Sequence, residues 1–142
     1  RAPRPRRSGT VASMALPPMP PTPLIVLRTV ATVVISALIG QAGWAAALLG
    51  GDDGYRAYHQ VGAWATLTLC VAAAVVYLAM RRAAGTVNVV LAVSVAAAAS
   101  VQFALGEWGA TSVHIFLGVL LVMLGTALTS WTYRHQLPAD VA

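Results

Sequence analysis

The stretch AYHQVGAWATLTLCVAAAVVYLAM, residues 57–80, contains no Asp, Glu, Lys or Arg and is bounded by Arg56 and Arg81. It is longer than the roughly 20 apolar residues that a helix needs to cross about 30 Å of hydrocarbon. Three further stretches are equally free of charge, residues 29–51, 83–106 and 108–133. Only 9% of the 142 residues are charged, against about 25% in a typical soluble domain. The sequence therefore predicts an all-α fold, a bundle of four transmembrane helices.

The segments between these stretches set the predicted domain boundaries. We expect helices at residues 24–49, 55–80, 86–105 and 110–133, which together form a transmembrane domain over residues 24–134. Residues 1–23 hold four Arg and seven Pro, a composition that excludes a helix and predicts a disordered cytoplasmic tail. Residues 135–142 form a short cytoplasmic tail, in which His135 is expected to be solvated.

Three short turns are expected to join the helices. Residues 50–54 and 106–109 are rich in glycine, and residues 83–85 separate the second helix from the third. Short polar side chains at a helix start accept hydrogen bonds from the free amides of its first turn. We therefore expect capping of the second helix by Asp52 or Asp53, and of the fourth by Thr111 or Ser112.

Arginine marks one side of the predicted bundle. Every basic residue is Arg, and eight of the nine lie before residue 29, at 81–82 or at 134. Asp52, Asp53 and Glu107 lie on the other side, with Arg56. Because Arg-rich loops stay in the cytoplasm, both termini are predicted to be cytoplasmic (N-in, C-in). The Arg, Ala, Val and Gly excess is typical of a GC-rich bacterial genome, so we expect a multi-pass protein in the lipid bilayer of a bacterial plasma membrane, with no nucleic-acid partner.

The two halves of the chain share a pattern. Each predicted hairpin has a Gln near the outer end of its first helix, a Trp near the turn, and a His about a turn and a half into its second helix. These residues are Gln41, Trp44 and His59 in the first hairpin, and Gln102, Trp108 and His114 in the second. We interpret the bundle as two related hairpins about a pseudo-twofold axis; the alternative is chance similarity between two Ala/Val-rich segments.

The two histidines are the main candidates for chemistry. Each shares its helical face with small or weakly polar residues, which is typical of an interface between helices and not of a lipid-facing surface. Ionisable residues inside a membrane are costly and mark functional sites. Two imidazoles from facing helices can supply both axial ligands of a haem, so we predict that His59 and His114 bind the iron of haem b. The alternatives are hydrogen bonds to Gln41, Gln102 or interfacial water, a proton relay, or a bare metal site.

Five further residues complete the predicted cofactor site. Gly62 and Gly118 would leave room between helices for a flat macrocycle. Arg56, one turn above His59, is expected to pair with a propionate at the outer surface. Gln41 and Gln102 are expected to hold the imidazole tautomers as hydrogen-bond partners, unless they only link helices.

The chain resembles one four-helix half of the haem A synthase family at two pairs of motifs. The first pair is VQFALG at 101–106 with HIFLG at 114–118, and the second is IGQ at 39–41 with HQVG at 59–62. The resemblance covers about residues 35–134 and implies that His59 and His114 are an axial pair. That family has two such halves, and its catalytic half carries a Glu four residues before a His, where this chain has Tyr55. A half on its own looks more like a small b-type cytochrome or a cofactor-bearing accessory subunit.

Three functions remain open from the sequence. The first is a haem-b-binding membrane protein in electron transfer or haem handling. The second is a non-catalytic accessory subunit of a larger membrane complex, such as a respiratory one, and the third is a transporter or proton-conducting module. We expect a homo-oligomer or a larger complex, since two copies could together mimic the full eight-helix architecture. No catalytic residue is predicted, because no hydrolytic or transferase constellation is present.

Overall fold

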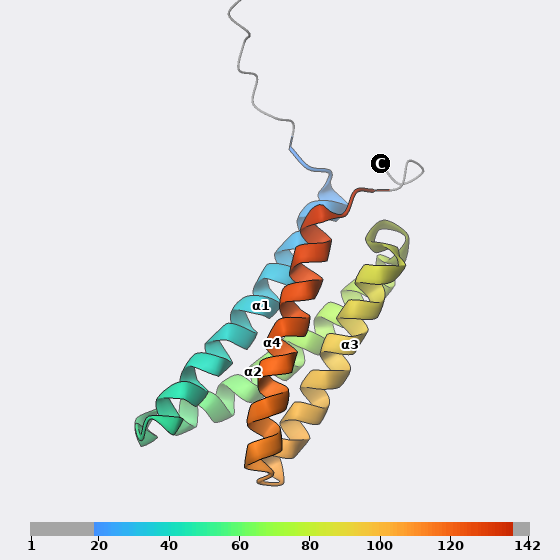
Figure 1. Ribbon diagram of the computed structural model, residues 1–142. Coiled ribbons are helices and arrows are strands. Elements are labelled where there is room, and N and C mark those ends of the chain that lie inside the picture. Colours follow the sequence, from blue (N-terminus) through green and yellow to red (C-terminus); the bar gives the residue numbers. More distant parts are fainter. Residues whose placement is uncertain (1–18, 138–142) are drawn as a thin grey trace, which may run out of the picture.

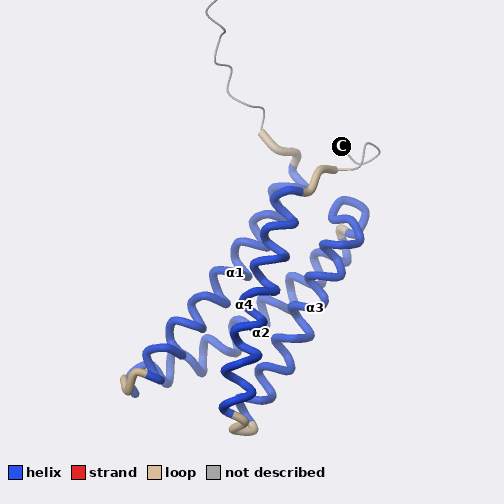
Figure 2. Tube along the Cα trace, viewed as in Figure 1, coloured by secondary structure: helices blue, strands red, loops and turns tan. Residues whose placement is uncertain are grey.

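The computed structural model describes residues 19–137 and consists of four long α-helices (Figure 2). These are α1 (Thr22–Leu49), α2 (Arg56–Ala79), α3 (Arg81–Glu107) and α4 (Thr111–Arg134), with a short 3-10 helix, η1 (Asp53–Tyr55), between α1 and α2. Each α-helix is long and apolar enough to cross a membrane. The predicted all-α fold with four membrane-spanning helices is therefore confirmed.

The first helix begins earlier than predicted. The helix starts at Thr22, so Pro23 lies in its first turn instead of in a tail. Proline is tolerated there because the amides of a first turn have no partner within the helix. Of the tail predicted at 1–23, residues 1–18 lie outside the described residues, as do residues 138–142 of the tail predicted at 135–142.

The connection between α2 and α3 is tighter than the expected turn. Met80 alone separates the two helices, and residues 81–84 form a helical turn of their own. Gly85 then interrupts α3 with φ 74° and ψ 156°, a conformation that is essentially restricted to glycine. The ring of His135 packs against Gly85, and its Nε2 donates to the carbonyl of Ala83 at 2.8 Å. His135 is half-buried, which corrects the expectation of a solvated end residue, because this hydrogen bond ties it to the turn.

The predicted helix caps are wrong. Asp52 accepts a hydrogen bond from the amide of Gly54 at 3.0 Å and so caps η1, because that short helix intervenes before α2. The first turn of α4 follows Ala110, and no side chain caps it. The hydroxyl of Thr111 instead donates to the carbonyl of Gly109 at 3.3 Å.

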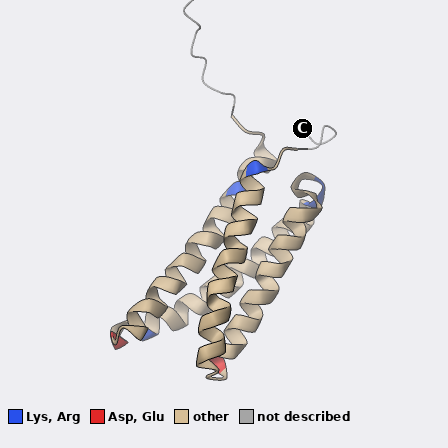
Figure 3. Ribbon diagram, viewed as in Figure 1, with Lys and Arg blue, Asp and Glu red and all other residues tan. Residues whose placement is uncertain are grey.

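The helices form a ring in which each packs against two neighbours, in the order α1, α2, α3, α4 and back to α1. Figure 1 shows that the start of α1, the end of α4 and the turn between α2 and α3 lie at one end of the bundle, which we call the terminal end. The connections at residues 50–55 and 108–110 lie at the opposite end, the loop end. The ribbon colours of Figure 3 show Arg positions of the described residues at the terminal end and Asp and Glu positions at the loop end. Arg56, the first residue of α2, is the exception at the loop end.

A chain of buried hydrogen bonds joins all four helices near the terminal end. The hydroxyl of Tyr77 on α2 lies 3.0 Å from the carbonyl of Leu27 on α1 and 2.8 Å from the hydroxyl of Thr132 on α4. Thr132 donates to the Oδ1 of Asn88 on α3 at 3.1 Å, and the Asn88 amide donates to the carbonyl of Ala84 at 2.9 Å. Because these side chains are fully buried, each bond satisfies a group that would otherwise be costly in an apolar interior.

Helices α1 and α4 are in close contact over the half of their length next to the terminal end. A Cβ on Gly125 of α4 would collide with the side chain of Leu38, and the hydroxyl of Thr129 reaches the carbonyl of Ala31 at 3.4 Å. Beyond this region the two helices diverge toward the loop end, as Figure 1 shows. The resulting space is bordered by all four helices and contains the candidate site.

Candidate functional site

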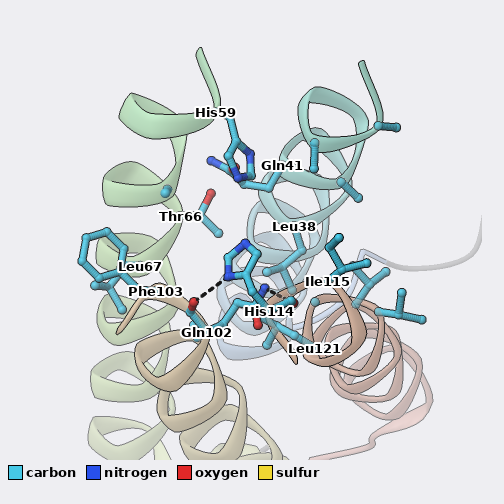
Figure 4. Close-up of a pocket in the computed structure, with 18 of the residues that line it drawn as sticks. Leu38, Gln41, His59, Thr66, Leu67, Gln102, Phe103, His114, Ile115 and Leu121 are labelled. Atoms are coloured by element: carbon cyan, nitrogen blue, oxygen red, sulfur yellow. Dashed lines mark hydrogen bonds between the residues drawn. The ribbon is translucent and has the colours of Figure 1, made fainter. Parts of the chain in front are cut away.

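A cavity of about 450 Å³ lies between the helices in the half of the bundle next to the loop end. Its volume lies within the range of small-molecule and cofactor sites. Most of its lining is aliphatic, with the ring of Phe103. The polar lining residues are Gln41 on α1, His59 and Thr66 on α2, Gln102 on α3 and His114 on α4 (Figure 4). The structure therefore brings both predicted imidazoles and both predicted glutamines into one apolar chamber.

The two imidazoles face each other across this cavity. Their ring centroids are 6.3 Å apart, and the ring planes are inclined at 89°. Two imidazoles that bind one metal ion from opposite sides, each through a nitrogen at about 2.0–2.1 Å, have centroids about 6 Å apart. Any angle between the ring planes is compatible with such binding, because both planes can contain the line through the nitrogens and the metal. The spacing of His59 and His114 thus matches that of two axial ligands.

The ring of His114 is held in place by Gln102. Its Nδ1 lies 2.9 Å from the backbone carbonyl of Gln102, and the Gln102 side-chain amide donates to the backbone carbonyl of His114 at 2.6 Å. A carbonyl can only accept a hydrogen bond, so Nδ1 carries the proton and the lone pair lies on Nε2. This arrangement is typical of metal-binding histidines, whose second nitrogen is oriented by a hydrogen bond.

The ring of His59 is held less firmly, although the backbone of Gln41 lies beside it much as that of Gln102 lies beside His114. The Nδ1 of His59 is buried, and among the described residues no group accepts or donates a hydrogen bond to it. Both polar atoms of the Gln41 side chain and the Oε1 of Gln102 are likewise buried without a hydrogen-bond partner there. Unpaired buried polar groups are rare and costly. Their concentration around one cavity marks it as the candidate site among the described residues.

The predicted glycines have different surroundings. Gly118 lines the cavity, and a Cβ at this position would lie 3.0 Å from the Nε2 of Gln102. Gly62 is buried and does not line the cavity, because Trp44 and Gln41 of α1 cover it and would collide with a Cβ there. Gly62 therefore lets α1 approach α2 closely. The side chains of Trp44 and Gln41 fill the space beside it, which is thus closed to a ligand.

Arg56 lies outside the cavity. Its guanidinium forms an ion pair with Asp53 at 2.7 Å, and 73% of its side chain is exposed at the loop end. Among the described residues, no group of three or more His, Cys, Asp or Glu side chains could hold a metal ion. His59 and His114 are therefore the candidate ligands that the described cavity offers.

The cavity is open on one side, a feature that the sequence analysis missed. Six of its lining residues are also exposed on the surface of the bundle, and all six belong to α1 or α4. We call this opening the mouth; its residues are Ala42, Ala46 and Leu49 on α1, and Ile115, Val119 and Met123 on α4. All six are apolar, so nothing in their residue types distinguishes them from ordinary lipid-facing positions. Only the divergence of α1 from α4 makes them part of a site.

No protein-family model, curated protein or solved structure matches this chain. Its function is therefore argued from the cavity and its side chains. The resemblance to one half of haem A synthase stays a prediction from the sequence motifs.

Proposed function

We propose that this protein binds haem b in the membrane through the imidazoles of His59 and His114, and serves in electron transfer or haem handling. The 6.3 Å separation of the two imidazole centroids inside an apolar cavity carries this proposal. A structural metal ion is usually held by four protein ligands, and a catalytic zinc by three. A haem brings four ring nitrogens of its own and needs only the two axial ligands that this cavity offers.

The remaining lining residues suit the same cofactor. Aliphatic side chains from all four helices surround the imidazoles and would exclude water from the macrocycle. When bound, a haem supplies one-electron chemistry, with a potential set by the axial ligands and the burial of the site. Gln102 orients His114, and Gln41 offers two unpaired polar atoms beside the cavity. Arg56 remains the proposed partner of a propionate, since an exposed ion pair such as Arg56–Asp53 contributes only about 0–1 kcal/mol and exchanges easily.

The orientation and the repeat also belong to this proposal. The clustering of Arg at the terminal end supports a cytoplasmic position for that end. With that orientation, the cavity would lie in the outer half of the proposed bacterial plasma membrane. Matching contacts support two related hairpins. In each hairpin the Gln of the first helix lies against a glycine of the second, Gln41 against Gly62 and Gln102 against Gly118. The histidines precede these glycines by three and four residues.

A spectroscopic experiment tests the proposal. The protein is purified in detergent, reconstituted with hemin, and examined by reduced-minus-oxidised absorption spectroscopy. We expect the sharp α and Soret bands of a six-coordinate bis-imidazole haem, and their loss or conversion in His59→Ala and in His114→Ala. His135→Ala is the matched control, because His135 lies at the opposite end of the bundle and should leave the spectrum unchanged. A stable protein that stays colourless with hemin would refute the proposal.

A further inference from the structure

The mouth is the side on which the lining of the described cavity is most exposed. On α2 and α3, every lining residue is buried or half-buried. The rings of Phe103 on α3 and Trp64 on α2 meet with centroids 4.5 Å apart and close that side. On α1 and α4 the lining is open, with Leu49, Val119 and Met123 exposed by 66%, 58% and 63%. The cavity therefore opens sideways, between α1 and α4.

The chemistry of the mouth identifies the phase that it faces. Its six residues are all apolar, and they lie within helices long and apolar enough to span a membrane. In a bilayer such surfaces contact acyl chains and not water. One wall is built largely from alanine, whose small side chain leaves room for a wide ligand, and the opposite wall carries branched or flexible side chains. A molecule that enters here comes from the hydrocarbon of the membrane.

The two imidazoles differ in a way that suits exchange. The ring of His114 is oriented by one hydrogen bond, from its Nδ1 to the backbone carbonyl of Gln102 at 2.9 Å, whereas the buried Nδ1 of His59 forms no hydrogen bond among the described residues. A ligand whose ring is not oriented by a second hydrogen bond binds a metal less firmly, typically by about 10–100-fold. The bond from a metal to His59 is therefore expected to be the weaker of the two.

We propose that haem reaches and leaves the imidazole pair sideways through the mouth, so that the protein exchanges haem with the bilayer instead of holding it permanently. This inference rests on the proposed haem-binding function and favours haem handling over electron transfer. The exchange forms and breaks only the bonds between iron and the two imidazole nitrogens, and no electron is transferred. The outer half of α1 and the outer half of α4 are the two sides of the route.

Bulky substitutions in the mouth test this route. Apoprotein in lipid nanodiscs is mixed with vesicles that contain hemin, and the rate at which the bis-imidazole spectrum appears is recorded. The test variants are Ala46→Trp on one wall and Val119→Trp on the other. The control is Ala97→Trp, an exposed alanine of α3 outside the cavity lining. Thermal unfolding of each apoprotein shows that the variants are folded, and two variants on different helices guard against misfolding of either one.

The expected result is slower loading without loss of the final spectrum. Both mouth variants should load roughly tenfold more slowly or worse than the wild type, since a blocked route lowers the association rate. Ala97→Trp should load at the wild-type rate. If both mouth variants load as fast as the control, the lateral route is refuted while haem binding stands. If the wild type itself shows no bis-imidazole spectrum, the haem proposal and this inference fall together.

Discussion

The hydrogen-bond chain near the terminal end makes two similar mutations differ in cost. Thr132→Val and Tyr77→Phe each remove one buried hydroxyl and leave the shape of the side chain nearly unchanged. In Thr132→Val, the Oδ1 of Asn88 loses the donor that lies 3.1 Å away. Asn88 is only 1% exposed, so no water replaces that donor. Leaving a buried acceptor unpaired costs about 1–3 kcal/mol.

Tyr77→Phe leaves no buried acceptor unpaired. Thr132 keeps its bond to Asn88, and the carbonyl of Leu27 keeps the amide partner that an α-helix provides. What is lost is the one interhelical hydrogen bond that the phenol can donate, to the carbonyl of Leu27 at 3.0 Å or to the hydroxyl of Thr132 at 2.8 Å. Side-chain hydrogen bonds between membrane helices average about 0.6 kcal/mol. We therefore expect Tyr77→Phe to cost about 1 kcal/mol and Thr132→Val about 2 kcal/mol.

The free energies of unfolding of both variants are measured by reversible unfolding in mixed micelles. A denaturing detergent is titrated in, and circular dichroism follows the loss of helix. The double variant completes the cycle and gives the coupling between the two hydroxyls, which should be non-zero because they share a hydrogen bond. A cost for Tyr77→Phe that equals or exceeds that for Thr132→Val would refute the reasoning from the connectivity of the chain.

Three further predictions follow from the packing and the site. Gly62→Ala should lower the free energy of unfolding by about 1–3 kcal/mol in the same assay, because its Cβ would overlap Trp44 and Gln41. Gly43→Ala, with nothing within 4 Å of its Cβ, should raise the free energy of unfolding by about 0.5–1 kcal/mol. Equal effects of the two variants would contradict the packing of α1 on α2. Gly85→Ala should cost about 1–3 kcal/mol, because φ is 74° there, and an unchanged thermal midpoint would count against that backbone conformation. In hemin titrations, His59→Ala should retain a five-coordinate spectrum. His114→Ala should bind hemin at least about tenfold more weakly than His59→Ala, since only the ring of His114 is oriented by a hydrogen bond. A higher hemin affinity of His114→Ala would contradict the inequivalence of the two ligands.

Much of the fold follows from the distribution of charge along the chain. Helix ends in a membrane are set by where charged and turn-forming residues occur, and α2 and α4 begin and end within one residue of the predicted bounds. The observed helix bounds differ from the predicted ones where proline or glycine changes the local backbone conformation. Pro23 extends α1 because its position in a first turn needs no amide, and residues 81–84 stay helical because only Gly85 has the freedom to break the helix.

The candidate site was only partly visible in the sequence. His59, His114, Gln41 and Gln102 were found because polar groups within apolar helices stand out, and the structure places all four around one cavity. Asn88 is polar within an apolar helix as well, but the structure gives it a role in packing with Thr132 and Tyr77.

By itself, the sequence determined that the chain forms four helices of membrane-spanning length, because the cost of placing charge in hydrocarbon is local and can be read residue by residue. Only the tertiary structure decided which small residues face a cavity and which face a neighbouring helix. Gly62 is covered by Trp44, while Ala42 and Ala46 border the mouth. The physical reason is that a small residue permits close packing and open space equally well. The angle between α1 and α4 depends on packing along their whole length. That angle decides whether a small residue is covered by a neighbouring helix or borders open space.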